Sequence, residues 1–248
     1  MRKEYRKESG FPDRKIMKKK AYVIAGMAAM LALAGCNEQT VDNAKLYGEG
    51  VDSAFETEDM QLETCVMAVG EEEVSLNEFL FYVYQLKSSN DGVLTDDVWD
   101  YSYADGKNIE AYSKEEIVRE IAQIKIICQE AEKEQVTLTE EETNQANVQA
   151  GKFVENLPEG VEDYNLTREM VSAIYQEHAL AKKMYDVVGG TIDTTVTDDA
   201  ASDPETGTAY KESVLAEREK EAFIAAYAEW KEEYKIVASQ TLLDEISF

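Results

Sequence analysis

The chain has 248 residues and a formal net charge of −26, because 51 aspartate and glutamate residues outnumber 25 lysine and arginine residues. Phosphate binding needs a basic protein face, so this charge argues against nucleic acid as a partner. The length suffices for one large domain or two small ones.

The N-terminus has the layout of a bacterial lipoprotein signal. Three lysines at 18–20 precede an apolar run at 21–34, which is short for a bilayer span and leads into the lipobox-like Leu33-Ala34-Gly35-Cys36. We predict that residues 1–35 are a signal peptide and that Cys36 carries a lipid. The protein would then be anchored to the cell membrane and face the extracytoplasmic side. An ordinary secretory signal is the alternative, and Met17 is a plausible true start.

Residues 36–62 are polar and acidic, which is typical of a flexible tether. The apolar pattern begins after it, where residues 65–69 predict a short strand and residues 70–73 a turn. Ser75, three residues before a glutamate, forms a capping-box pattern that opens a helix over 76–88.

Three more helices are predicted in the middle of the chain. A capping-box pattern at Ser113 predicts a helix over 114–135, whose broad apolar face indicates a central position. A third such pattern at Thr139 predicts a more polar helix that extends to 154. A further helix over 166–188 ends at Gly189-Gly190, which predicts a glycine C-cap.

The chain ends in a predicted helix over 209–235, a short strand over 235–239 and one or two helical turns over 241–247. The strands at 65–69 and 235–239 are too short to stand alone, so we predict that they pair. Pairing would bring the last helix back onto the first. The predicted fold class is therefore mainly α, with a small antiparallel β pairing of N-terminal and C-terminal strands.

No pattern in the sequence predicts a metal, nucleotide or hydrolase site. The three cysteines and the single histidine lack metal-ligand spacing, and neither a glycine-rich nucleotide loop nor a Gly-x-Ser-x-Gly elbow occurs. We therefore predict no cofactor, no metal and no catalytic residue. Cys128 lies on the apolar face of its helix, where a small core residue is expected. A disulfide between Cys65 and Cys128 is permitted outside the cytoplasm but is not required.

Residues 66–79, VMAVGEEEVSLNEF, resemble the opening pattern V-N-G-x-x-I-T-x-x-E-F of the SurA/PrsA-type foldases. Residues 129–142, QEAEKEQVTLTEEE, are similar to that family's pattern x-x-A-x-x-x-G-I-x-V-T-x-E-E. Residues 221–237 look like the helix and strand that close the family's chaperone domain. The resemblance covers most of residues 64–240 and implies that residues 63–248 form a helical chaperone domain like the one at the N-terminus of SurA.

In that family a parvulin prolyl isomerase domain usually interrupts the chaperone domain before the final long helix. Here the corresponding position is the linker 189–209, which is rich in turn formers and too short to bury a core. The paired histidines of a parvulin site are also missing, because His178 is the chain's single histidine. A lone histidine in a helix is usually a structural or surface residue. The resemblance therefore implies a lipoprotein that lacks the parvulin domain.

Aromatic residues supply the candidate client-binding surface. Two tyrosines lie off the apolar face of the helix over 76–88, and an aromatic and acidic stretch follows. Exposed aromatic rings beside a flexible loop can form an adaptable binding surface, but packing in the core or between domains is the commoner role of such side chains. The candidate residues are Tyr82, Tyr84, Trp99, Tyr101 and Tyr103.

These features predict a membrane-anchored, chaperone-like lipoprotein that binds unfolded or secreted polypeptides without catalysis. A groove framed by the N-terminal helices and the long last helix would shield apolar client segments, and the acidic surroundings would attract basic clients. Two alternatives stay open at this point. One is a diverged peptidyl-prolyl cis-trans isomerase, and the other is a surface adaptor for one dedicated protein partner.

Overall fold

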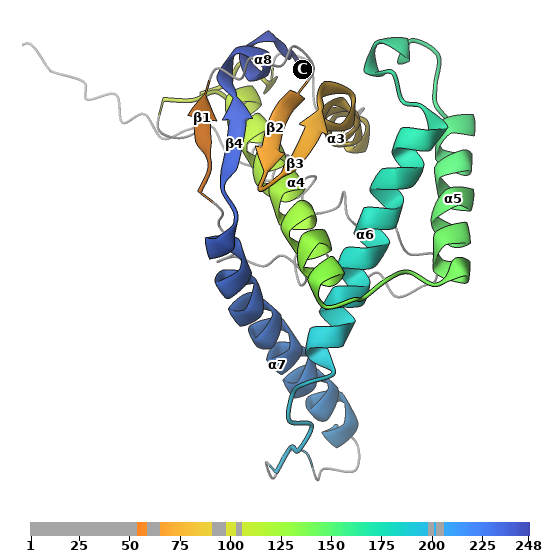
Figure 1. The fold of residues 1–248 in the computed structure, drawn as a ribbon, viewed down its shortest axis with the longest axis vertical. Coiled ribbons are helices and arrows are strands. Elements are labelled where there is room, and N and C mark those ends of the chain that lie inside the picture. Colours follow the sequence, from red (N-terminus) through yellow and green to blue (C-terminus); the bar gives the residue numbers. More distant parts are fainter. Residues whose placement is uncertain (1–53, 59–64, 91–97, 103–105, 198–200, 202–205) are drawn as a thin grey trace, which may run out of the picture.

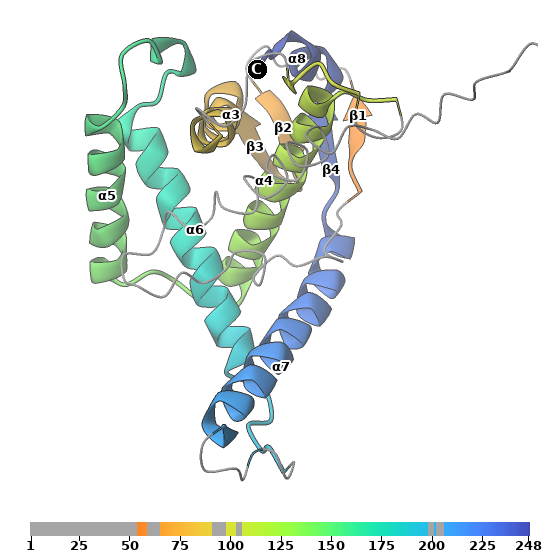
Figure 2. The ribbon, with the colours of Figure 1, turned by 180° about the vertical axis from the view of Figure 1, so that it is seen from behind.

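A computed structural model describes residues 54–58, 65–90, 98–102, 106–197, 201 and 206–248 of the chain. The predicted signal peptide, Cys36 and most of the predicted tether lie outside these residues. Within them the fold is mainly helical and carries a small mixed sheet, which confirms the predicted class in outline. Figures 1 and 2 show this arrangement from opposite sides.

In the described part of the chain, the sheet has the strand order β1-β4-β2-β3. β1 is Glu56–Glu58, β2 is Cys65–Val69, β3 is Glu72–Ser75 and β4 is Ile236–Ser239. β2 and β4 run antiparallel, with Met67 opposite Ala238, which confirms the predicted pairing of the two distant strands. β1 lies within the segment expected to be a tether and adds a parallel edge strand to β4.

The β2–β3 hairpin is tighter than predicted, because only Gly70 and Glu71 form the turn and β3 begins at Glu72. Gly70 has a φ of +62°, and a Cβ at this position would lie 2.9 Å from the Tyr234 ring. Both the backbone conformation and the lack of space therefore favour glycine. The expected turn over 70–73 is wrong in its second half, where pairing with β2 extends the chain and buries Val74.

α3 (Leu76–Ser89) follows β3 directly, and the Ser75 side chain caps it by accepting a hydrogen bond from the backbone N–H of Glu78. α4 (Ile109–Lys133) begins earlier than the predicted start at 114. Its N-cap is Asn108, and Ser113 lies inside the helix. Asparagine caps a helix as well as serine does, and burial of Ile109 in the core stabilises the additional first turn.

α5 (Glu140–Glu155) and α6 (Arg168–Gly189) form a helical hairpin, and the short 3-10 helix η3 (Glu162–Tyr164) lies in their connection (Figure 2). The predicted capping box at Thr139 is confirmed, since both of its hydrogen bonds with Glu142 are present. The predicted glycine C-cap is only partly right. Gly190 does cap α6, but its φ of −64° is right-handed and does not require glycine.

α7 (Gly207–Trp230) and the 3-10 turn η5 (Lys231–Glu233) lead into β4, and α8 (Gln240–Glu245) follows the strand. α6 and α7 converge at the end of the molecule that is farthest from the sheet (Figure 1). Between them, residues 190–197 of the predicted linker contain no helix or strand. The Arg218 guanidinium holds this segment on α7 by donating to the carbonyls of Asp193 and Thr195, at 2.6 and 2.9 Å.

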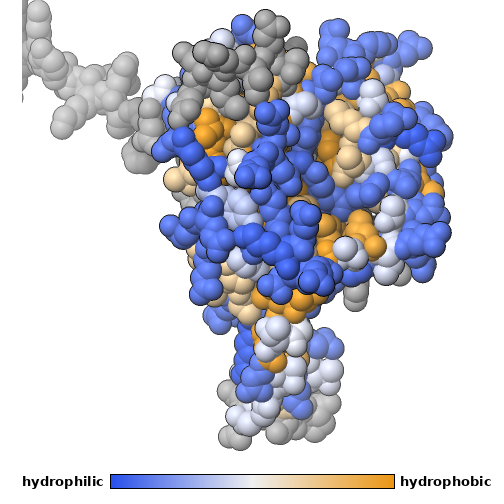
Figure 3. Space-filling view, in the orientation of Figure 1, coloured by the Kyte–Doolittle hydropathy of each residue, from blue (hydrophilic) through white to orange (hydrophobic). Residues whose placement is uncertain are grey.

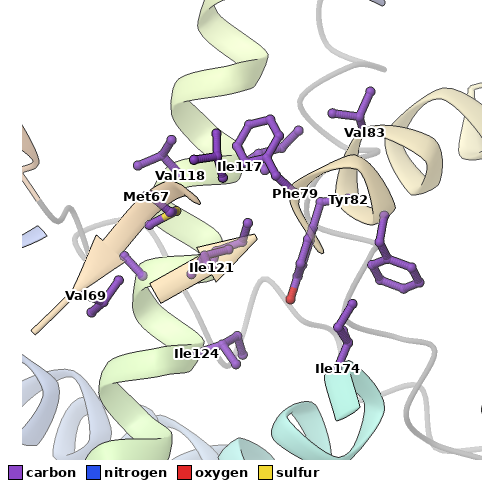
Figure 4. Close-up of a cluster of buried hydrophobic side chains, with 14 of the residues drawn as sticks. Met67, Val69, Phe79, Tyr82, Val83, Ile117, Val118, Ile121, Ile124 and Ile174 are labelled. Carbon is purple, nitrogen blue, oxygen red and sulfur yellow. The ribbon is translucent and has the colours of Figure 1, made fainter. Parts of the chain in front are cut away.

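One contiguous hydrophobic cluster joins the sheet to the helices (Figure 4). α4 packs against β2, α3, α6 and α7, which confirms its predicted central position. The largest fully buried side chains of the cluster include Met67, Phe79, Tyr82, Leu86, Ile117, Ile121, Ile124, Ile174, Phe223 and Tyr227. Cys65 and Cys128 are both free thiols, so the disulfide that the sequence permits is not formed.

Candidate functional site

A shallow, open groove of about 280 Å³ lies where α3, α5 and α6 meet. One tyrosine of α3 and one tyrosine of α6 contribute rings to its wall. The other lining residues belong to α5 or directly follow that helix. The lining residues are Tyr84, Gln149, Lys152, Phe153, Asn156, Leu157 and Tyr175.

The spacing of residues along α5 explains why this helix lines the groove. Gln149, Lys152 and Phe153 are three or four residues apart, so they lie on one face of the helix, and Asn156 caps its end. The face therefore presents two carboxamides and one ammonium group around a central aromatic ring. Leu157 closes the apolar side of the groove just beyond the cap.

The aromatic rings form a set of edge-on and tilted contacts across these elements. The Phe153 ring centroid lies 5.9 Å from that of Tyr84 and 6.2 Å from that of Tyr175. Tyr84 also meets Tyr164 of η3 at 5.4 Å, and Phe81 of α3 lies 5.5 Å from Phe153. Such contacts contribute to stability beyond the burial of area, so the aromatic floor of the groove is well supported.

Two hydroxyl groups give the groove polar contacts. Tyr175 has only 5% of its surface exposed, and burial raises its pKa to about 12. Burial and the neighbouring Tyr164 also raise the pKa of Tyr84. Both tyrosines therefore stay protonated at neutral pH. Among the described residues neither hydroxyl has a hydrogen-bond partner, so both are available to the backbone or side chains of a bound molecule.

The structure separates the predicted client-binding residues. Tyr84 lines the groove, and Tyr101 is half-buried against the core. Tyr82 and Trp99 are buried with 1% and 5% of their surfaces exposed, so the expectation that they are exposed is wrong and core packing is correct for both. Tyr103 lies outside the described residues.

Core contacts explain the burial of these two side chains. Trp99 packs edge-on against Phe248, with ring centroids 5.0 Å apart. The Tyr82 hydroxyl bonds to Nε2 of His178 on α6, 96 residues away in sequence, at 3.0 Å. Helical periodicity places Tyr82 off the main apolar face of α3, but α6 covers the side of α3 on which Tyr82 lies.

The sequence did not single out the groove residues of α5 and α6. Phe153 and Tyr175 belong to two different helices, and each is compatible with ordinary packing. A usable signal was the three- and four-residue spacing of Gln149, Lys152 and Phe153 on a polar helix. The predicted groove also involved the last helix, whereas α7 contributes no residue to the groove described here.

His178 is buried, and burial together with the nearby Lys125 lowers its pKa to about 4. The imidazole is therefore neutral at physiological pH, and its one described hydrogen bond fixes it to the core tyrosine Tyr82. It does not line the groove. This position agrees with the structural role expected for a lone helical histidine.

A buried ionic cluster lies in the interior between α3, α4 and α6. The Lys125 ammonium is 2.5 Å from Glu177 and 3.0 Å from Glu78. Burial alone would lower the pKa of Lys125, but attraction by Glu177 and Glu78 raises it. Burial raises the pKa of Glu177 to about 7 despite that attraction, because one cation faces several carboxylates. The cluster is an internal link between helices and is separate from the groove lining.

Within the described ranges, no group of three or more histidine, cysteine, aspartate or glutamate side chains is placed to hold a metal ion. The helices described here also include none with the length and apolar character needed to cross a bilayer.

Comparison of the chain with protein-family models, with curated proteins and with solved structures finds no match.

Proposed function

We propose that this protein is a membrane-anchored, extracytoplasmic, chaperone-like lipoprotein that binds apolar segments of unfolded or secreted polypeptides without catalysis. The observation that carries the proposal is the open aromatic groove between α3, α5 and α6. The resemblance of residues 66–79 and 129–142 to the SurA/PrsA-type foldases supports the same class of function.

The composition of the groove suits a polypeptide better than a small metabolite. Its volume of about 280 Å³ lies just below the range that is typical of small-molecule sites, and it is open rather than enclosed. One or two large side chains of a client would rest on Phe153 and Leu157. The carboxamides of Gln149 and Asn156 and the hydroxyl of Tyr175 would bond to the client backbone, which is the same in every sequence.

Shallow binding is an advantage for this function. A protein that binds unfolded chains tightly stabilises the unfolded state and opposes folding. A groove that holds only one or two side chains gives weak and reversible contacts, so a client can leave and fold. No covalent step is required of any residue.

The surface and the net charge of the molecule suit a protein body that a separate anchor holds at a membrane. Figure 3 shows a face covered largely by hydrophilic residues, interrupted by small hydrophobic patches. The net charge of −26 would keep complexes with clients in solution, attract basic clients and repel anionic lipid headgroups. Attachment to the membrane would then depend on a lipid at Cys36.

Suppression of the aggregation of a denatured reporter protein by the fragment 37–248 tests the proposal. We expect suppression by the native sequence and a several-fold weaker effect from Leu157→Asn, which places a polar group in the apolar side of the groove. Val148→Ala is the matched control, because Val148 is 46% exposed on the same helix and does not line the groove. Absence of suppression, or equal suppression by both variants, would contradict the proposal.

Two further assays separate the proposal from the alternatives. A prolyl-peptide isomerisation assay would reveal a diverged isomerase as acceleration over the slow uncatalysed reaction, which takes tens of seconds or longer. Affinity capture would recover one protein if the chain is a dedicated adaptor, and many unrelated unfolded proteins if it is a chaperone.

A further inference from the structure

The edge strand β1 is attached to the sheet differently from the other strands. It runs parallel to β4, with Glu56 opposite Val237, Thr57 opposite Ala238 and Glu58 opposite Ser239. Figure 1 shows it at the outer edge of the sheet, beyond β4. This strand pairs with the outer edge of β4, and that edge would otherwise present its backbone donors and acceptors to any extended chain.

The side chains of β1 contribute little to its attachment. Glu56 and Thr57 are exposed. Glu56 forms an ion pair with Lys235 at 3.1 Å, but 66% and 59% of the two side chains are exposed, and such surface pairs are worth little. The residue before the strand, Phe55, is half-buried against the core and is the apolar anchor within the described residues 54–58.

The other edge of β4 is held much more firmly. There β4 pairs with β2 in an antiparallel register, and Met67 and Val69 face the core together with Ile236 and Ala238. All four of these side chains are buried. Removal of β2 would therefore open the core, whereas release of β1 would expose mainly backbone groups and the seat of one ring.

The seat of β1, meaning the residues of the protein body that contact its side chains, contains two basic residues. The Arg119 guanidinium lies 5.6 Å from the centre of the Phe55 ring, which is within the range of a cation–π contact, and it also pairs with Glu115 and Glu116. Lys235 contacts the carboxylate of Glu56, which is the residue that follows Phe55. These contacts suit an aromatic residue, and Lys235 adds a smaller preference for an acidic residue directly after it.

We propose that the outer edge of β4 is a docking site for an extended polypeptide segment with an aromatic residue followed by an acidic residue, and that β1 occupies this site as an exchangeable internal strand. Strand addition to a sheet edge is a general mode of peptide recognition, with affinity from the backbone and selectivity from the side-chain seats. The site is separate from the aromatic groove, and the inference does not depend on the proposed function.

A labelled peptide tests the exchange. The probe is fluorescein-labelled VDSAFETEDM, the sequence of residues 51–60, and the receptor is the full chain in detergent micelles. Apparent affinity falls with the fraction of molecules whose site is open. We therefore expect the Phe55→Ala chain, whose own strand is loosened, to bind the probe at least about fivefold more tightly than the native chain. A probe with alanine in place of phenylalanine should bind more weakly to both chains.

Charge reversal provides a second, independent measurement. The Lys235→Glu chain should prefer a probe with lysine at the position of Glu56 over the native probe, while the native chain should show the opposite preference. Both probes meet the same fraction of open sites within one chain, so the preference does not depend on how far the substitution loosens β1. This comparison decides the question even if Phe55→Ala fails to fold. The groove variant Leu157→Asn should leave probe binding unchanged, so failure of this inference is distinguishable from failure of the proposed function.

Three results would overturn the inference. One is equal affinity of the native chain and Phe55→Ala for the probe, together with unchanged amide hydrogen exchange in residues 236–239. Another is that the native chain and the Lys235→Glu chain show the same preference between the two probes. The third is a dimer in which residues 54–58 pair with β4 of a second copy, because that result would assign the edge to self-association.

Discussion

At the scale of single residues, Lys125 is a buried cation that lies between two carboxylates. Its side chain is 7% exposed and lies between Glu78 of α3 and Glu177 of α6. Taking charges out of water is costly, and a buried pair repays that cost only while both partners are present. Lys125 therefore links three helices by ion pairs, and removal of either partner would leave a charge that destabilises the folded state.

Replacement of Lys125 by methionine should strongly destabilise the protein. The variant leaves the partly buried carboxylates of Glu78 and Glu177 without their cation. Removal of one partner of a fully buried pair typically costs about 3–5 kcal/mol of unfolding free energy, and we expect a loss toward the lower end of that range. Urea unfolding followed by circular dichroism measures the effect. The control is Lys182→Ala, which breaks an exposed ion pair with Asp186 and should change the free energy by less than about 0.5 kcal/mol. Equal stability of the two variants would show that the cluster is solvated.

Glu177 should make the protein less stable as the pH rises. Burial raises its folded pKa to about 7 from 4.5, so the charged form is disfavoured in the folded state. The stabilising contribution is complete below pH 4.5 and is lost as the pH rises through 7. The loss is at most about 3 kcal/mol, because water still reaches part of the side chain. Lys125, Glu78, Glu72 and Cys128 are titratable groups that interact with it.

The measurement compares the native chain with Glu177→Gln. The difference in unfolding free energy, taken as variant minus native chain, should increase between pH 4.5 and 7 and then level off. A direct pH profile of the native chain is less informative, because His178 acts in the opposite sense. Its pKa is lowered from 6.5 to about 4, so it contributes stability above pH 6.5 that is lost as the pH falls through 4. Parallel curves for the two chains would contradict the assignment to Glu177.

At the scale of single elements, the start of α4 shows how a local signal can mislead. Ser113 and Glu116 have capping-box spacing, yet the helix begins at Ile109 behind the Asn108 cap. The Ser113 side chain is fully buried, and its hydroxyl has no hydrogen-bond partner in the described structure. The Asn108 side chain accepts a hydrogen bond of 2.8 Å from the backbone N–H of Ala111.

Alanine substitutions at these two positions should therefore have unequal effects. Asn108→Ala removes a side-chain cap and should cost about 1 kcal/mol of unfolding free energy. Ser113→Ala removes a buried hydroxyl without a partner, so the change should be less than about 0.5 kcal/mol or slightly stabilising. Thermal unfolding of both variants measures the difference. A larger loss for Ser113→Ala would mean that the serine is the functional cap.

At the scale of the whole molecule, the closure of the chain depends on β4. This strand lies between β1 and β2 and so connects the C-terminal end of the chain to two segments near residues 56 and 67. Lys133 and Glu130 of α4 reinforce the closure, because they bond to Glu233 and Tyr234 just before the strand, each at 2.7 Å. The sheet is small, but it closes the helical body.

Proline substitution should reveal the unequal importance of the two strands. Val237→Pro places a residue without an N–H in an interior strand and should cost more than about 3 kcal/mol or abolish folding. Thr57→Pro in the edge strand should cost less than about 1 kcal/mol, because proline is tolerated at sheet edges. Urea unfolding of each variant tests this difference. A similar loss from both would mean that β1 is an integral part of the fold.

Much of the secondary structure could be predicted from the sequence because its signals are local. The strand at 65–69, the caps at Ser75 and Thr139, and the apolar face of α4 each depend on residues within a few positions of one another. Pairing of β2 with β4 also followed, since two short strands each need a partner. The predicted lipid site at Cys36 lies outside the described residues and stays a prediction.

The sequence by itself determined the positions of most helices and of the strands β2 and β4, because hydrogen bonding within an element and the period of its apolar residues are local properties. Only the tertiary structure decided that β1 joins the sheet, that Tyr82 is buried, and that Tyr84, Phe153 and Tyr175 form one groove. The physical reason is that periodicity shows which face of an element is apolar but not which distant element covers it. The Tyr82–His178 bond spans 96 residues, and no local pattern contains both partners.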